Sequence, residues 1–294
     1  MTLIIQDLKE NIKNITFPSG TNNYYENDSA DGFAFLGAAR LIVGLDADKC
    51  YEEIKKRNYT LNVDKIIARP NRKVFKDTQY VYTLWACIEM LSRLEGQGET
   101  INFLIDRVNQ IGQYENGMMR YCTTEINYIV PNVSSAAALI YSINQEVPKA
   151  NRLLTILKEN QLGYGNWEYK IRGKKTQNFV SAGICEDSYH LAMMVYHLKE
   201  ITRLTGLDTS SITKRSLQRL REINEKKLDA GSVGWGIPML ALAAHGLDSE
   251  LYERALNETL SKSIKHTNFR TRSIAAFCLA KIWTEAEDDY FKKI

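Results

Sequence analysis

The chain has 294 residues, of which 44% are hydrophobic and 25% charged, a composition typical of a folded domain with a sizeable core. Its 38 basic and 35 acidic residues leave a net charge of +3, too small an excess to indicate a nucleic-acid or membrane-binding protein. No apolar run approaches the ~18 residues that span a bilayer, and the N-terminus lacks the apolar core of a signal peptide. The sequence therefore predicts a single cytoplasmic domain over residues 1–294, with no membrane insertion and no nucleic-acid partner.

The cysteines are scattered, odd in number and without C-x-x-C spacing, which argues against a disulfide framework or a zinc knuckle. We expect buried free thiols, no metal and no cofactor. The five positions are Cys50, Cys87, Cys122, Cys185 and Cys278.

Helical periodicity recurs along the chain, and no segment shows sustained strand alternation. Residues 77–93 place apolar side chains on one stripe, behind a candidate N-cap at Asp77. Residues 134–144 are small and apolar nearly all round, which predicts a fully buried inner helix. Residues 186–204 repeat apolar side chains at spacings of three and four and end at Gly206, a typical C-terminal stop.

Charged and apolar helices alternate in the second half of the chain. Residues 212–228 are amphipathic and strongly charged, as expected for an outer helix. Residues 236–246 and 271–284 are again small and apolar. The pattern predicts pairs of helices, one inner and one outer, joined by glycine-aromatic turns.

An internal repeat supports this pairing. The segment Gln113–Met119 (QYENGMM) aligns with Gln161–Trp167 (QLGYGNW), 48 residues further on. Looser copies are Gly234-Trp235-Gly236 and Asp31-Gly32-Phe33. A period near 50 residues suits one helical hairpin, and stacked hairpins bury their inner faces against their neighbours. We expect about five or six hairpins closed into a ring.

Three segments resemble known toroids. The run 160–169 resembles the Q-x-x-x-G-x-W repeat of squalene-hopene-cyclase-like and prenyltransferase-like α/α toroids. The run 128–137 resembles their N-x-x-x-A-x-A-L inner helix. The run 186–190 resembles the D-x-x-H helix start of a cyclase-like branch associated with bacterial surface-polysaccharide gene clusters. The resemblance implies an all-α fold, a closed α/α toroid with a functional pocket at one mouth.

The acidic motifs of terpene chemistry are absent. Terpene cyclases of the alkene-protonating class carry D-x-D-D, and prenyl diphosphate chemistry uses D-D-x-x-D. The chain offers only Asp46-Ala47-Asp48 and Glu287-Asp288-Asp289, in a different context. An isoprenoid cyclase or prenyltransferase is therefore an alternative function and not the first hypothesis.

The candidate catalytic residues are Glu186, Asp187 and His190. On a helix, the spacing of Asp187 and His190 places both side chains on one face, where a carboxylate can orient an imidazole for acid–base work. The structural alternative is an N-cap at Asp187 and a packing histidine at His190. His197 shares that face and suits packing better. A zinc site with Cys185 is disfavoured, because Cys185 points about half a turn away from His190.

Candidate ligand-binding residues lie on the predicted connections. Tyr128 and Asn132 flank the entry to an inner helix, where they could hydrogen-bond a polar ligand or serve as loop and cap residues. Tyr164, Trp167 and Trp235 lie on turns and suit sugar stacking. The structural alternative is that the tryptophans fasten adjacent hairpins.

Basic side chains also gather on two predicted loops. Arg72 belongs to the cluster 69–73, and Arg172 lies with Lys170, Lys174 and Lys175 after the Gly-Trp turn. Arginine binds carboxylates and phosphates bidentately, so a rim of this kind suits an anionic sugar. Solvated surface loops are the structural alternative.

Three functions follow from these patterns. The first is a glycan-active or glycan-binding toroid that takes a polar or anionic saccharide at the mouth of the ring. The second is the isoprenoid cyclase or prenyltransferase alternative. The third is a non-catalytic toroid that binds a peptide or protein. Whether the chain is an enzyme, and whether it forms oligomers, stay open at this stage.

Overall fold

The computed structural model describes residues 30–42, 44–60, 79–122, 128–172, 179–184, 188–226, 228 and 236–263. These residues form ten helices, which follow one another as five hairpins. The helices are α2 (Ala30–Ile42), α3 (Asp48–Lys56), α4 (Val81–Leu91), α5 (Gly98–Ile111), α6 (Pro131–Ile143), α7 (Val147–Glu159), α8 (Ser188–Thr205), α9 (Ser210–Ile223), α10 (Gly236–Ala244) and α11 (Ser249–Ser263).

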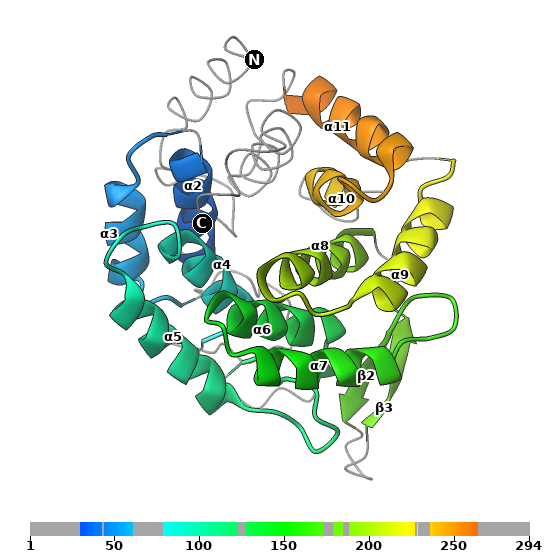
Figure 1. The fold of residues 1–294 in the computed structure, drawn as a ribbon, viewed down its shortest axis with the longest axis horizontal. Helices are drawn as coiled ribbons and strands as arrows, with labels where there is room; N and C mark the ends of the chain where they lie inside the picture. The colour runs from blue at the N-terminus through cyan, green and yellow to red at the C-terminus, as the bar shows by residue number, and fades with distance from the viewer. Residues whose placement is uncertain are drawn as a thin grey trace, which may run out of the picture.

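The five hairpins curve into a ring, with the even-numbered helices inside and the odd-numbered helices outside (Figure 1). Each inner helix contacts the next inner helix along the chain, from α2 through α4, α6 and α8 to α10. Each also contacts the outer helix that follows it. The core therefore lies between the two layers and between successive inner helices.

Side-chain composition separates the two layers. In α6 every residue from Pro131 to Ser142 is buried, because its small side chains allow close approach on all sides. In the outer helix α7 the buried positions are Ala150, Leu153, Leu154 and Leu157, at spacings of three and four. The sequence prediction of an inner helix over residues 134–144 is confirmed, as is the outer character of the segment at 212–228, which forms α9.

The connections differ in length at the two ends of the ring. Those from an inner helix to its outer partner are short, such as residues 144–146 between α6 and α7. Those from an outer helix to the next inner helix are long, such as residues 160–187 between α7 and α8. Because the inner helices all run the same way, the long connections gather at their N-terminal ends. We call this end the mouth.

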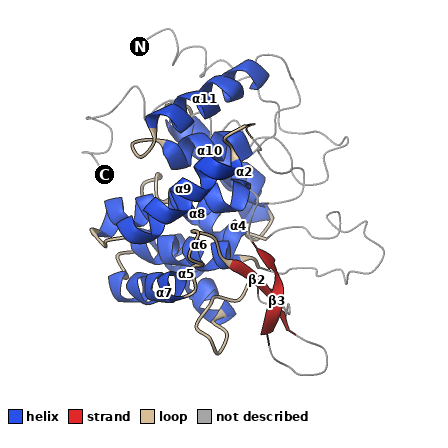
Figure 2. Cartoon of the chain, turned by 90° about the vertical axis from the view of Figure 1, so that its right-hand side faces the viewer, coloured by secondary structure: helices blue, strands red, loops and turns tan. Residues whose placement is uncertain are grey.

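A small antiparallel sheet lies at the mouth (Figure 2). Its strands are β1 (Tyr128–Ile129), β2 (Glu168–Arg172) and β3 (Phe179–Ile184), in the order β1-β2-β3. A β-bulge interrupts the pairing of β2 with β3 between Tyr169 and Lys170. This sheet was not predicted, although the five residues of β2 (EYKIR) alternate between polar and apolar.

The two copies of the internal repeat fold in the same way. In the first, the amide of Tyr114 donates to the carbonyl of Met118 (2.8 Å), and the amide of Gly117 donates to Tyr114 (2.9 Å). The equivalent bonds 48 residues later run from Leu162 to Asn166 (2.8 Å) and from Gly165 to Leu162 (2.9 Å). The repeat read from the sequence is therefore one structural unit.

Glycine is required in these turns by both conformation and space. Gly117 and Gly165 have positive φ angles of 80° and 97°. A Cβ atom on Gly165 would lie 2.3 Å from the carbonyl oxygen of Arg215 in α9. The turn after α7 thus packs directly on the backbone of the next outer helix and fixes the spacing of the two hairpins.

Three local predictions are corrected or fall outside the described residues. Helix α4 begins at Val81 after Tyr80, so Asp77 is not its N-cap. Asp31-Gly32-Phe33 lies within α2 and is not a turn of the repeat. The apolar segment at 271–284 lies outside the described residues. The stop at Gly206 is confirmed, with its amide bonded to the carbonyl of Thr202 (2.8 Å) and a φ of 73°.

Candidate functional site

The mouth brings together several residues singled out from the sequence. Asn132 lies in the first turn of α6 and His190 in the first turn of α8. Tyr128 lies on β1, directly before α6. These elements are adjacent, since α6 contacts α8 and β1 pairs with β2. The sequence prediction that connections into inner helices share one end of the ring agrees with this arrangement.

His190 is half-buried between aromatic rings at the mouth. Its imidazole meets the ring of Tyr189 at a centroid distance of 4.6 Å and the ring of Tyr169 on β2 at 6.2 Å, both edge to face. Glu186 and Asp187 lie outside the described residues, in the two positions before α8 begins at Ser188. Their pairing with His190 therefore stays a prediction.

Asn132 is buried and only partly satisfied. Its Nδ2 lies 3.7 Å from the sulfur of Met193, while its Oδ1 has no hydrogen-bond partner among the described residues. A buried amide oxygen without a partner costs free energy, so such a group is a candidate for binding a ligand or a water.

One turn deeper, His197 has the packing role. It is fully buried, and its Nδ1 lies 2.9 Å from the hydroxyl oxygen of Ser135 on α6. Burial lowers the pKa of His197 to about 3, so the imidazole is neutral at physiological pH. It supports the mouth from below and does not line it.

The sequence reasoning missed a set of contacts that join α4 to α8 across the inside of the ring. Tyr82 of α4 lies close to Tyr189 of α8, and Tyr196 donates to Glu89 (2.9 Å) two turns deeper. Between these two pairs, Trp85 of α4 meets His197 of α8 at 4.5 Å. Burial raises the pKa of Tyr82 well above its usual value.

Burial also raises the pKa of Glu89, although the nearby Arg93 and the Tyr196 hydroxyl both oppose this shift. The signal in the sequence was Glu89 itself, the one charged residue in the apolar run 81–91. A second missed acid is Asp31, which is fully buried in the first turn of α2 and so lies at the mouth. Below the mouth, most described side chains of α4, α6 and α8 are buried, whereas His190 at the mouth is half-buried.

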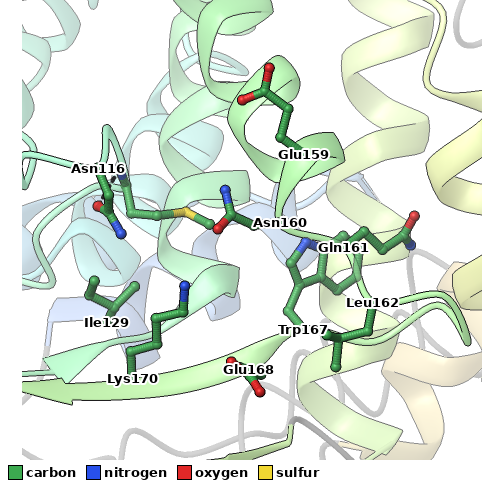
Figure 3. Close-up of a pocket in the computed structure, with 10 residues that line it drawn as sticks. Asn116, Ile129, Glu159, Asn160, Gln161, Leu162, Trp167, Glu168 and Lys170 are labelled. Atoms are coloured by element: carbon green, nitrogen blue, oxygen red, sulfur yellow. Dashed lines mark hydrogen bonds between the residues drawn. The ribbon is translucent and has the colours of Figure 1, made fainter. Parts of the chain in front are cut away.

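A separate pocket of about 230 Å³ lies on the outer side of β2, at the same end of the molecule (Figure 3). Its walls are the turn after α5, the end of α7 and the strands β1 and β2. Lys170 and Glu168 of β2 line it, as does Trp167. Lys170 and Arg172 therefore lie on a strand, which corrects the sequence prediction that placed them on a loop.

The two aromatic residues predicted to bind ligand in the second repeat differ in environment. Trp167 is 1% exposed, and its indole nitrogen donates to the carbonyl of Leu157 (2.8 Å). This bond fastens the turn to α7, although one edge of Trp167 also lines the pocket. Tyr164 is 46% exposed and lies against the outer helix α9, with Arg219 above its ring at 5.8 Å.

The glutamine of the second repeat copy also has a structural role. Gln161 is buried, and its Nε2 donates to the carbonyls of Gly165 and Ile212 (both 3.1 Å) and to the hydroxyl of Ser216 (2.9 Å). The motif therefore ties the turn to α9 by side-chain hydrogen bonds as well as by the glycine contact.

The remaining predicted residues are only partly described. Glu186, Asp187, Arg72 and Trp235 lie outside the described residues. For Tyr128 and Arg172 the structure gives strand positions: Tyr128 of β1 pairs with Ile171 of β2, and Arg172 ends β2 opposite Phe179 of β3. Within the described part of the chain, no three His, Cys, Asp or Glu side chains are grouped as a metal site would require. Cys50, Cys87 and Cys122 are buried free thiols.

Among the helices described, none is long and apolar enough to cross a membrane. The cytoplasmic location stays a prediction from the sequence.

Comparison with known proteins identifies the fold and no family. No protein-family model matches the chain, and neither does any curated protein sequence. Among solved structures, it is similar to an inactive variant of the α-1,6-mannanase GH76A of Salegentibacter sp. HEL1_6 in complex with α-1,6-mannotriose. That similarity has a TM-score of 0.66 and 11% identity, over 94% of this chain and 96% of the mannanase.

Two further structures are similar over most of their length. A glycoside hydrolase family 76 mannosidase of Bacteroides thetaiotaomicron has a TM-score of 0.62 and 9% identity, over 92% of each chain. A sugar epimerase from a ruminal bacterium has a TM-score of 0.60 and 12% identity, over 98% of this chain and 100% of the epimerase. At such low identity these similarities establish the fold. The chain is an α/α toroid, as the sequence predicted.

Proposed function

We propose that this toroid acts on a saccharide held at the mouth of the ring, with Glu186, Asp187 and His190 as its catalytic residues. The observation that carries the proposal is the position of His190. It is half-buried in the first turn of an inner helix, its ring meets that of Tyr169, and it lies three residues after the second of two consecutive acids in the sequence.

The chemistry suits hydrolysis or rearrangement at a glycosidic centre. Glycoside hydrolases use two carboxyl groups, one as general acid and one as base or nucleophile. In the similar mannanase, the inactive variant has two neighbouring aspartates replaced, and this chain has the neighbouring acids Glu186 and Asp187. We assign the acid and base roles to this pair and a hydrogen-bonding role to His190.

The saccharide would be held by polar and aromatic groups around the mouth. Asn132 contributes an amide oxygen that lacks a partner among the described residues. Tyr128, Arg72 and Trp235 complete the proposed binding set, the arginine for an anionic substituent and the tryptophan for stacking. Arg172 is not included, because it has the same parity along β2 as Glu168 and Lys170, which line a different pocket. The similar structures include sugar-active proteins of more than one reaction type, a mannanase and an epimerase, which supports the substrate class more than the reaction.

The isoprenoid alternative has less support. It requires an open aromatic cavity, whereas the described aromatic rings inside the ring pack on one another. Phe35 meets Trp85 at 5.5 Å and Tyr82 at 6.0 Å; Phe35 and Trp85 are buried, and Tyr82 is half-buried. The resemblance to cyclase-like toroids therefore extends to the fold, and we do not extend it to the substrate.

A panel assay tests the proposal. The purified chain is incubated with α-1,6-mannooligosaccharides, xylooligosaccharides, uronate-containing oligosaccharides and prenyl diphosphates, and products are separated by chromatography. We expect a saccharide product that Glu186→Gln and Asp187→Asn each reduce at least about a hundredfold, typical for loss of an acid–base group. The control is Glu99→Gln, at the opposite end of the ring in the exposed start of α5. A product only from the prenyl diphosphates would overturn the proposal.

A further inference from the structure

The pocket on the outer side of β2 forms where the two repeat turns meet. The turn after α5 contributes Asn116 and Met118, and the end of α7 contributes Asn160. The strands close it, with Ile129 from β1 and Lys170 from β2 (Figure 3). Each wall belongs to a hydrogen-bonded turn, a helix end or a strand, so the pocket is preformed.

Three charged residues line this pocket: Lys170, Glu168 and Glu159, whose carboxylate points away from the other two (Figure 3). Neither the ammonium group of Lys170 nor the carboxylate of Glu168 has a hydrogen-bond or ion-pair partner among the described residues, although both side chains are half-buried. Partly buried charges that leave their hydrogen-bonding capacity unused are available to a ligand.

The two asparagines complete a balanced set of donors and acceptors. The Oδ1 of Asn116 accepts from the amide of Met118 (3.2 Å), which leaves its NH2 group for a ligand. The Nδ2 of Asn160 donates to the carbonyl of Ile156 (2.8 Å), which leaves the Oδ1 of Asn160 to accept a hydrogen bond from a ligand. The pocket therefore offers donors from Asn116 and Lys170, and acceptors from Asn160 and Glu168.

This chemistry selects the class of ligand. Lys170 disfavours a metal cation, and Glu168 disfavours a phosphate or carboxylate. A hydroxyl group both donates and accepts, so a ligand with several hydroxyls can satisfy all four groups at once. Met118, Ile129 and the edge of Trp167 provide an apolar surface for C–H groups. A volume of about 230 Å³ is below the 300 Å³ at the lower end of drug-sized sites, which limits the ligand to about one sugar ring.

Strand β2 separates this pocket from the mouth. Tyr169 faces His190 on one side, while its neighbours Glu168 and Lys170 line the pocket on the other. We propose that the pocket is a second binding site, which takes one neutral sugar unit and is distinct from the site at the mouth. The choice of a sugar as ligand rests on the proposed function, but the site requires no catalysis.

The test is binding of methyl α-D-mannopyranoside, followed by NMR of the 15N-labelled tryptophan indoles and by calorimetry. Trp167 is a local reporter because its indole N–H is fixed to Leu157 and its ring borders the pocket. Its resonance is assigned with Trp167→Phe. We expect the mannoside to shift the Trp167 resonance.

Binding is followed by the Trp167 resonance. Lys170→Met and Glu168→Gln should each raise the dissociation constant of the mannoside about tenfold, the loss typical of a hydrogen bond to a charged group. The matched control is Lys158→Met, an exposed lysine near the same end of α7 that does not line the pocket. It should bind as the unaltered chain does.

The outcomes separate this proposal from the proposed function. No shift at Trp167, or equal binding in Lys170→Met, Glu168→Gln and the unaltered chain, would overturn the second site even if the chain turns over a saccharide. A Trp167 shift that both pocket variants lose would support the second site even if no substrate is ever turned over. A shift confined to Trp85, which packs on His197 below the mouth, would locate the sugar at the mouth alone and also overturn the proposal.

Discussion

The ring of Tyr169 on β2 meets the imidazole of His190 on α8 edge to face, with centroids 6.2 Å apart. Tyr169 lies within the long connection between α7 and α8, and His190 lies in the first turn of α8, so the contact places a strand of that connection against the candidate catalytic histidine. An edge-to-face pair contributes about 0.5–1.5 kcal/mol beyond the burial of its rings.

The first prediction concerns this contact. Tyr169→Leu should lower kcat/KM for the saccharide about threefold to tenfold, because His190 loses the ring that holds its orientation. Phe103→Leu, an exposed aromatic on the outer helix α5, is the control and should leave kcat/KM unchanged. Equal kinetics in Tyr169→Leu and the unaltered chain would show that the contact does not position His190.

The second prediction concerns the turn after α7. Gly165→Ala should lower the free energy of unfolding by about 3 kcal/mol, since the new methyl group would meet the backbone of Arg215 at a positive φ. Gly163→Ala in the same turn is the matched control, because a Cβ there meets no atom within 4 Å. Urea unfolding of both variants measures the difference. Similar stability in the two variants would contradict the packing described for this turn.

The third prediction is a pH dependence of stability from His197. The unfolded chain binds a proton at this residue below its ordinary pKa of 6.5, whereas the folded chain does so only near its lowered pKa of about 3. The His197 contribution to stability is therefore present above pH 6.5 and is lost as the pH falls from 6.5 toward 3.

Within that window the free energy of unfolding should fall by about 1.4 kcal/mol for each unit by which the pH drops, because of His197 alone. In His197→Gln this part of the slope should vanish. Denaturant midpoints between pH 7 and pH 4 measure it, and an unchanged slope in His197→Gln would show that the imidazole does not stay neutral in the fold.

The fourth prediction tests the contacts that join α4 and α8. Tyr196→Phe removes the hydroxyl that donates to Glu89 and leaves a buried carboxyl oxygen with one partner fewer. We expect a loss of about 1–3 kcal/mol of unfolding free energy, the usual cost of an unsatisfied buried group. The double variant Tyr196→Phe with Glu89→Leu should lose less than the sum of the two single variants, because the two residues are in contact. Additive losses would exclude a direct interaction.

Sequence patterns predicted the helices and their pairing well. The small, apolar run after Pro131 could only form a helix buried on all sides, and the glycine repeat gave turns whose hydrogen bonds are the same in both copies. Both features depend on neighbours along the chain or on a repeated motif, and such local signals are visible in a single sequence.

Sequence patterns predicted less of the candidate site than of the fold. The Tyr82–Tyr189 and Glu89–Tyr196 pairs each join residues 107 positions apart, so no spacing along the chain could reveal them. The strand β2 was missed because its pairing partners come from two different connections. Trp167 combines the two roles considered from the sequence, since its indole is bonded to the preceding helix and its ring also borders the pocket.

The central claim is that a saccharide binds at the mouth, where the inner helices begin. Hydrogen–deuterium exchange of the Glu186→Gln, Asp187→Asn variant with and without α-1,6-mannotriose tests it most directly. The account predicts slower exchange on ligand binding at the starts of α6 and α8 and along β2, and no change in the short connections at 92–97 and 144–146. Protection at those short connections, or no protection at the mouth with any saccharide of the panel, would contradict it.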